Sequence, residues 1–116
     1  MSFMFNGCYE ITSLDLGIFN TSLVNDFSYM LDCNKLTYID FSNLKVGKGE
    51  LHTTMIHECN SLKYLNLWNL NPLEDFDTDY IFMFLPQGME VCINNPKRNN
   101  NLMNQTNNRH LTIKCY

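Results

Sequence analysis

Hydrophobic and polar positions follow a pattern that occurs three times along the chain. In each copy a cysteine is followed by apolar residues three, six and eight positions later. The copies are Cys8–Leu16, Cys33–Phe41 and Cys59–Leu67, so successive copies begin 25 and then 26 residues apart. A fixed period in this range is typical of stacked-repeat proteins, in which each unit buries its apolar face against its neighbours. The pattern therefore predicts a short solenoid of about three repeats.

The first complete unit, which begins at Cys8, predicts the structure of a single repeat. Its last apolar positions alternate with polar ones, as expected of a short strand with one buried face. Residues 17–22 then contain turn-forming glycine, asparagine and serine. Val24, Phe27 and Met30 recur at steps of three, which predicts a helical or 3₁₀ turn that faces the core. Each unit is thus expected to comprise a strand, a turn, a short helical segment and a return.

Both ends of the chain depart from the complete unit. The opening residues, Phe3–Cys8, are similar to the end of a repeat, so we expect residues 1–84 to hold a partial first repeat and then three units. Residues 85–116 are expected to form a β-rich C-terminal cap, because a terminal unit must close the open core. In that cap, residues 89–93 would pair with residues 111–115 across an Asn-rich, basic loop.

Composition favours a folded domain and excludes some partners. Hydrophobic residues make up 45% of the 116 residues and aromatic residues 13%, which is ample for a core. All twelve acidic residues lie in residues 1–90 with four lysines, so this part has a net charge of −8; residues 91–116 carry +4. An acidic body repels nucleic acid and anionic membrane. The sequence contains neither a membrane span nor a signal peptide.

The first unit closely resembles the repeat of a known family. Residues 4–30 read Met-Phe-Asn-Gly-Cys-x-x-Ile-Thr-Ser-Leu-Asp-Leu-x-x-Phe-Asn-Thr-Ser-x-Val-x-Asp-Phe-Ser-Tyr-Met, and this run resembles the BspA-like leucine-rich repeat. The resemblance extends to about residue 84. It weakens in the second and third returns, where Lys45–Glu50 and Glu74–Asp79 replace the expected Asn-Thr-Ser run. The resemblance implies an α/β protein, a right-handed β/α solenoid, on microbial surface or secreted proteins that serve adhesion to host or neighbouring cells.

A candidate binding surface follows from stacking the strands. The residues between the leucines would point outward and form columns, one with Ser13, Tyr38 and Tyr64 and another with Asp15, Asp40 and Asn66. A third column would contain Gly17, Ser42 and Trp68. Exposed tyrosine and tryptophan are frequent energetic anchors of interfaces. We therefore predict a recognition patch, and the alternative is that its aromatic rings pack on one another and shield the strands. The residues of this patch are Tyr38, Asp40, Tyr64, Asn66 and Trp68.

The three in-phase cysteines are predicted to be core residues. Cys8, Cys33 and Cys59 should stack as an inward column, since small buried thiols are common in protein cores. His57 and Cys59 lack the spacing of a zinc site, and no orienting third group for a Cys/His nucleophile is indicated. The sequence therefore predicts no catalytic residue, no metal ligand and no cofactor.

Cys92 and Cys115 differ from these three because they occupy the two expected cap strands. A disulfide between them would close the Asn-rich loop. It would form in an oxidising compartment, whereas both residues would remain thiols in a reducing cytosol.

These features lead to a non-catalytic binding module as the first hypothesis. Its partner would be a protein or glycoprotein on another cell or on matrix, and its location the cell surface or the medium, as the family resemblance implies. An intracellular leucine-rich-repeat scaffold is the alternative. A third hypothesis is a thiol hydrolase that uses Cys59 with His57 or His52, which would require an exposed, reactive cysteine.

Overall fold

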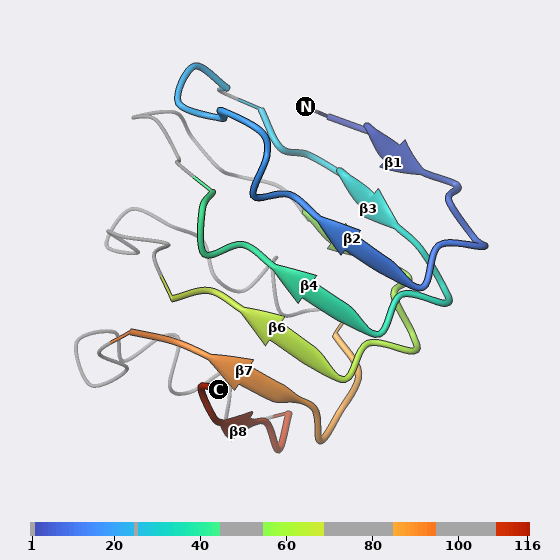
Figure 1. Cartoon of the computed structure of the whole chain (residues 1–116). Coiled ribbons are helices and arrows are strands. Elements are labelled where there is room, and N and C mark those ends of the chain that lie inside the picture. Colours follow the sequence, from blue (N-terminus) through green and yellow to red (C-terminus); the bar gives the residue numbers. More distant parts are fainter. Residues whose placement is uncertain (1, 25, 45–54, 69–84, 95–108) are drawn as a thin grey trace.

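The computed structural model describes residues 2–24, 26–44, 55–68, 85–94 and 109–116 (Figure 1). Within these ranges the chain forms short strands of two or three residues that belong to two parallel sheets. The strands are β1 (Phe5–Asn6), β2 (Ser13–Asp15), β3 (Leu31–Asp32), β4 (Tyr38–Asp40), β5 (Ile56–His57), β6 (Tyr64–Asn66), β7 (Glu90–Cys92) and β8 (Thr112–Ile113).

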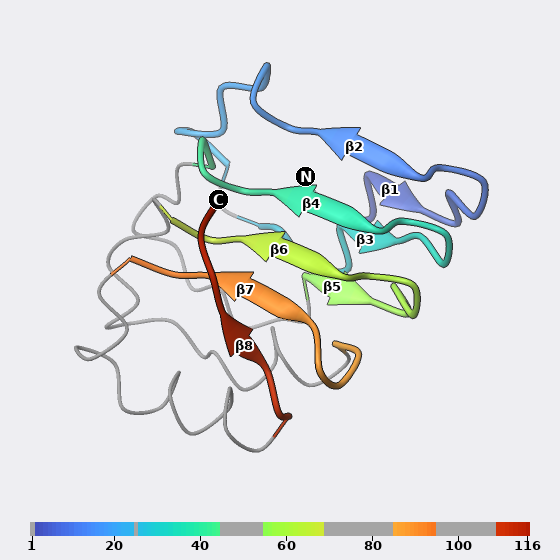
Figure 2. The same cartoon turned by 60° about the horizontal axis from the view of Figure 1, so that its bottom comes forward.

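The larger sheet has the order β2-β4-β6-β7-β8 and the smaller one the order β1-β3-β5 (Figures 1 and 2). Strands β2, β4 and β6 are the strands predicted from the three cysteine-led copies. They pair side by side and in parallel, with Leu14 opposite Ile39 and Ile39 opposite Leu65. The expected placement of these three segments is therefore confirmed.

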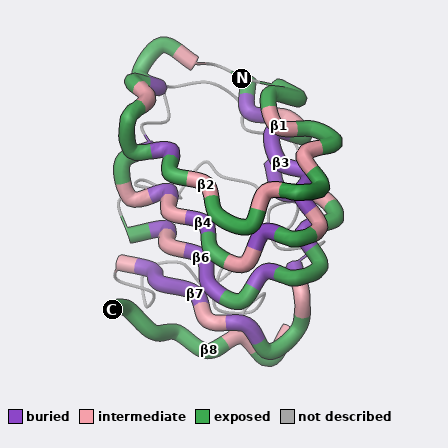
Figure 3. The backbone as a smooth tube through the Cα atoms, turned by 45° about the vertical axis from the view of Figure 1, so that its right-hand side comes forward, coloured by how far each residue is buried: buried purple, intermediate pink, exposed green. Residues whose placement is uncertain are grey.

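From β1 to β6 successive strands belong alternately to the smaller and the larger sheet, and the apolar side chains of both sheets form one core. Leu31 and Ile56 of the smaller sheet and Ile39, Leu65 and Val91 of the larger one have no exposed surface. Burial decreases towards strand β2, where Leu14 is only half-buried (Figure 3). This difference arises because β2 is an edge strand of its sheet, with a neighbour on one side alone.

A turn precedes each of these three strands, and the repeated cysteine is its first residue. The backbone carbonyl of the cysteine accepts a hydrogen bond from the N–H group three residues later in every copy. The N···O distances are 3.4 Å from Ile11 to Cys8, 3.1 Å from Leu36 to Cys33 and 3.1 Å from Leu62 to Cys59. The turn places that apolar residue towards the core and starts the strand. The repeated spacing is thus a turn signal as well as a burial signal.

The predicted helical segment of the first return is wrong. The described residues contain no helix, and residues 17–24 and 26–30 form turns and irregular segments that lead into β3. Phe27 and Met30 are buried as expected, and the N–H of Met30 donates to the carbonyl of Phe27 at 3.3 Å. Tyr29 between them has a φ of 48°, in the left-handed region that interrupts a right-handed helix. The chain then pairs with β1 and β5 instead of coiling.

The spacing of 25 and then 26 residues has a local cause. Gly7 lies between β1 and Cys8, and Glu58 lies between β5 and Cys59, whereas Asp32 of β3 is followed directly by Cys33. Both additional residues are left-handed, with φ of 75° for Gly7 and 49° for Glu58. Each additional residue is accommodated in the corner between the two sheets, so the register of the strands is preserved.

The two expected cap strands also pair. Val91 of β7 lies opposite Ile113 of β8, and the pairing is parallel. None of the described segments forms an apolar helix of membrane-spanning length. The Asn-rich loop of the cap and most of the second and third returns lie outside the described residues.

Candidate functional site

Aromatic residues gather on the outer side of the larger sheet. Tyr38 of β4 and Tyr64 of β6 are register partners, and their rings stack with centroids 5.2 Å apart and planes 13° apart. The ring of Tyr116 meets Tyr64 edge-on, with centroids 5.2 Å apart. Trp68 lies in the turn directly after β6, where its N–H donates to Asn66 Oδ1 at 3.0 Å. We call Tyr38, Tyr64, Trp68 and Tyr116 the aromatic face.

The members of the aromatic face differ in exposure. Tyr38 is 43% exposed, Trp68 44% and Tyr116 82%, whereas Tyr64 is only 8% exposed because it lies between two other rings. The position of Tyr64 agrees with the alternative expectation, in which the aromatic rings pack on one another. Tyr64 is therefore a support for its neighbours, and the ring surface open to a partner comes from Tyr38, Trp68 and Tyr116.

Sequence reasoning missed Tyr116, which contacts the aromatic face from the end of the chain. Its hydroxyl donates a hydrogen bond to a carboxylate oxygen of Glu90, and the Lys114 ammonium lies 4.6 Å from its ring centroid. Lys114 also forms an ion pair with Glu90 at 3.4 Å. The bond from Tyr116, assisted by Lys114, holds the pKa of Glu90 below its usual value. One feature of the sequence could have indicated this contact. The expected Cys92–Cys115 disulfide would place residue 116 beside β7.

Asp40 and Asn66 lie in one column, as expected, and Asp15 lies in that column with them. Each accepts a hydrogen bond at the side-chain oxygen from the backbone N–H two residues later: Gly17 to Asp15 at 2.8 Å, Ser42 to Asp40 at 2.7 Å and Trp68 to Asn66 at 3.0 Å. These turns end the strands. One side-chain oxygen of each residue is thus used within the fold to end its strand.

Asp40 and Tyr38 are coupled electrostatically. The Tyr38 hydroxyl donates to Asp40 Oδ2 at 3.3 Å. Partial burial acts to raise the pKa of Asp40, but the hydrogen bonds from Ser42 and Tyr38 outweigh it, so this pKa lies below its usual value. Burial and the nearby carboxylate raise the pKa of Tyr38. At neutral pH the pair is therefore a carboxylate beside a protonated phenol, which can accept and donate hydrogen bonds at one point on the face.

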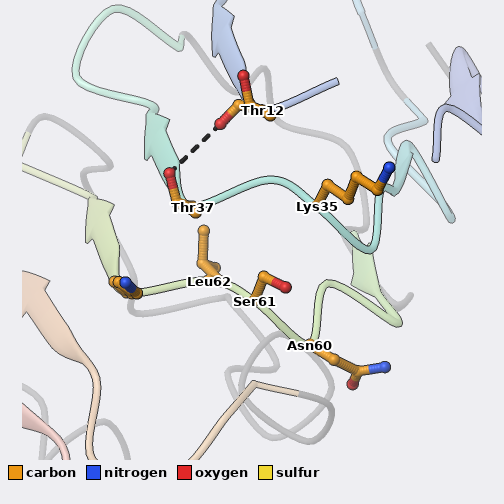
Figure 4. Close-up of a pocket in the computed structure, with 7 residues that line it drawn as sticks. Thr12, Lys35, Thr37, Asn60, Ser61 and Leu62 are labelled. Carbon is orange, nitrogen blue, oxygen red and sulfur yellow. Dashed lines mark hydrogen bonds between the residues drawn. The ribbon is translucent and has the colours of Figure 1, made fainter. Parts of the chain in front are cut away.

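A shallow hollow of about 540 Å³ lies along the turns that precede β2, β4 and β6 (Figure 4). Thr12 and Thr37 line it from adjacent units, and the hydroxyl of Thr37 donates to the carbonyl oxygen of Thr12 at 3.3 Å. Lys35 also lines the hollow but is paired with Glu10 at 2.7 Å. Most of the lining residues are of polar types, and they contain no catalytic grouping.

The three in-phase cysteines are oriented as expected of core residues. Cys33 and Cys59 are buried and Cys8 is half-buried. Burial raises the pKa of the Cys33 thiol and of the Cys59 thiol to about 11 in each case. At neutral pH these groups are protonated, and a protonated, buried thiol is a poor nucleophile. The environment of Cys59 therefore disfavours the thiol hydrolase hypothesis, and His52, its other candidate base, lies outside the described residues.

Cys92 of β7 and Cys115 are joined by a disulfide, with their Cα atoms 4.7 Å apart. Cys92 is buried, and Cys115 is exposed at the outer strand of the sheet. The bond connects the two ends of residues 92–115 and places Tyr116 next to β7. It therefore links the cap to the aromatic face.

The described surface thus offers recognition chemistry: three exposed aromatic rings, a carboxylate that remains ionised and an amide, which lie on the strands of one parallel sheet or shortly after them. These groups can bury apolar area and form directional hydrogen bonds with a partner. Comparison with protein-family models, with curated proteins and with solved structures finds no match for this chain.

Proposed function

We propose that the chain is a non-catalytic protein-binding module, and that its aromatic face is the contact surface. The module would be a leucine-rich-repeat solenoid of the BspA-like type, carried by a microbial protein at the cell surface or in the medium. Its role would be adhesion to a protein or glycoprotein on another cell or on matrix.

The repeat supports the solenoid part of this proposal. Strands β2, β4 and β6 share one register, and their three copies use the same cysteine-led turn. Units that bury their apolar faces only against one another form a rigid array with a regular outer surface. A rigid surface loses little conformational entropy when it binds a partner.

One observation carries the binding function: large aromatic side chains remain exposed on that rigid sheet. Tyr38 is held by stacking on Tyr64 and by its bond to Asp40, yet 43% of it remains exposed. Trp68 is 44% exposed. Preorganised tyrosine and tryptophan rings lose little rotamer entropy and dominate many protein interfaces. The ionised Asp40 beside Tyr38 favours a partner with Lys, Arg or amide donors.

The disulfide supports a location outside a reducing cytosol. Bonds such as Cys92–Cys115 persist in oxidising compartments and are rare in cytosolic proteins. The buried and protonated Cys33 and Cys59 are compatible with the same compartment, because a thiol that solvent does not reach is protected from oxidation.

Binding of the fluorescently labelled chain to cultured animal cells and to a basement-membrane matrix tests the proposal. Replacing Tyr38 and Trp68 together by alanine should reduce bound protein by about tenfold or more, since each anchor contributes on the order of 1 kcal/mol or more. Tyr29→Ala is the matched control, because Tyr29 is 39% exposed but precedes β3 of the other sheet. It should bind like the unmodified chain.

Two results would contradict the proposal. One is equal binding by the unmodified chain and the folded Tyr38→Ala/Trp68→Ala variant. The other is an equal loss with Tyr29→Ala, which would place the contact elsewhere. Thermal unfolding of each variant establishes that it is folded before binding is compared.

A further inference from the structure

The smaller sheet carries a cluster of metal-binding side chains that is separate from the aromatic face. Asp32 of β3 and His57 of β5 are register partners, and Glu58 follows His57. Each of the three residues offers one ligand atom, and these atoms all lie within 4.8 Å of one another. Two carboxylates and one imidazole thus meet at one corner of the molecule.

Asp32 gives independent evidence that this corner accepts a cation. The residue is only 7% exposed, and its Oδ1 atom is buried without a hydrogen-bond partner in the described structure. A buried carboxylate oxygen that lacks a partner is unfavourable, and such atoms are rare in folded proteins. A metal ion bound to Asp32 would satisfy this oxygen and neutralise its charge.

Exposure increases from Asp32 through His57 to Glu58, which are buried, half-buried and exposed respectively. The cluster therefore has a deep ligand and an open side through which an ion can enter. The ring of Tyr29 contacts His57 edge-on, with centroids 5.8 Å apart, and restricts the orientation of the imidazole. These contacts position the ligands before any ion binds.

We propose that Asp32, His57 and Glu58 bind a divalent transition-metal ion of the Zn²⁺ class. One imidazole nitrogen and two carboxylate oxygens suit Zn²⁺, whereas Ca²⁺ and Mg²⁺ prefer oxygen ligands alone. Three protein ligands leave a fourth position for water.

The geometry requires a small adjustment. Tetrahedral Zn²⁺ with bonds of about 2.0–2.2 Å brings its ligand atoms to roughly 3.3–3.6 Å from one another. The ligand atoms now lie within 4.8 Å of one another. Rotation of the exposed Glu58 side chain can shorten the separations that involve its carboxylate.

The site belongs to one pair of units. At the equivalent places in the partial first repeat, Asn6 lies opposite Asp32, and Gly7 supplies no side chain. Glu58 is the additional residue of the corner after β5 and has a left-handed φ of 49°. The ligand set thus occurs where β3 and β5 pair and is not repeated at β1.

Neighbouring cysteines are not needed as ligands. Cys33 and Cys59 follow Asp32 and Glu58 in the chain, but both are buried and belong to the hydrophobic core cluster. The Cys33 thiol donates to the carbonyl oxygen of Phe5 at 3.4 Å. Both side chains are therefore part of the core packing, whereas the three proposed ligands lie together at the corner.

Calorimetric titration of the full chain with ZnCl₂ tests the proposal. One Zn²⁺ should bind per chain and should raise the melting temperature. Asp32→Asn, His57→Gln and Glu58→Gln should each weaken Zn²⁺ binding by about tenfold or more, since each removes a direct ligand. His110→Gln is the matched control, because His110 is exposed and lies in the turn before β8 of the larger sheet; it should bind Zn²⁺ like the unmodified chain.

Three results would overturn the proposal. They are the absence of Zn²⁺ binding, unchanged binding by the three ligand variants, and a thiolate charge-transfer band in the Co²⁺ complex, which would assign the ion to the cysteines. Glu58→Gln alters an exposed side chain, so it remains informative if a buried variant does not fold. Because the aromatic face lies on the other sheet, these outcomes are independent of the adhesion experiment.

Discussion

At the scale of single residues, the strand ends depend on one repeated interaction. Asp15, Asp40 and Asn66 occupy equivalent positions, and each accepts a hydrogen bond from the N–H two residues later. Aspartate and asparagine are common in such turns because their short side chains reach their own backbone. The polar column predicted as a recognition feature therefore also has a structural function.

Asp40 makes the stability of the fold depend on pH. Its folded-state pKa lies below its usual value, so its contribution is present above the unfolded-state pKa near 3.8 and is lost as the pH falls through the folded-state value. Asp40→Asn should retain the turn at pH 7, as Asn66 does, and should flatten the loss of stability below about pH 4. Asp40→Ala should lower the free energy of unfolding by about 1 kcal/mol at pH 7.

Urea unfolding at several pH values measures both effects. Asp26→Asn is a useful comparison, because Asp26 also has a lowered pKa but lies in the first return, away from strand β4. Identical acid sensitivity of the Asp40→Asn variant and the unmodified chain would contradict the role assigned to Asp40.

At the scale of elements, the position of a strand in its sheet determines how much its apolar residue contributes. Leu65 of β6 is fully buried between Ile39 and Val91, whereas Leu14 of the edge strand β2 is half-buried. Leucines at equivalent positions of the repeat therefore contribute different amounts to the stability of the fold. The difference comes from the neighbours of each strand and not from its own sequence.

Leu65→Ala and Leu14→Ala are expected to differ in their effects. Leu65→Ala should lower the free energy of unfolding by about 4 kcal/mol, because it leaves a cavity in a fully packed layer. Leu14→Ala should lower it by about 2 kcal/mol or less, because solvent and partial collapse fill the site. Chemical denaturation of both variants checks the order, and equal losses would contradict the assignment of β2 as an edge strand.

At the scale of the whole molecule, the disulfide joins the cap to the repeat. Cys92 of β7 and Cys115 are separated by 23 residues in the chain, and their bond holds Tyr116 against Tyr64. A disulfide that closes a segment of this length restricts the unfolded ensemble and stabilises the folded state. The cap therefore affects both stability and the aromatic face.

Removing the bond should have a large effect. Cys92→Ser should lower the free energy of unfolding by about 3 kcal/mol under non-reducing conditions, and a reductant should have the same effect on the unmodified chain. Cys8→Ser keeps the disulfide and should retain the sensitivity to reductant. Stability that does not change with reductant would show that the Cys92–Cys115 bond contributes nothing to the fold.

The sequence by itself determined the units and their register. The spacing from cysteine to the third, sixth and eighth positions predicted the strands and the buried side chains, because those features depend on alternation between two faces. It also predicted the outward columns that contain Tyr38, Asp40, Tyr64 and Asn66, and the pairing of the two cap strands. Side chains of a strand alternate strictly between its two faces, so this pattern can be recognised in a single sequence.

Only the tertiary structure decided which residues from different units meet. The step of three from Val24 to Met30 suits a helical turn, but the chain turns between Phe27 and Met30 and then pairs as β3 with β1 and β5. Tyr64 became buried because Tyr116 arrives from the end of the chain. Asp32 and His57 became neighbours because β3 and β5 pair. Such contacts depend on the packing of distant segments, which residue spacing within one unit does not encode.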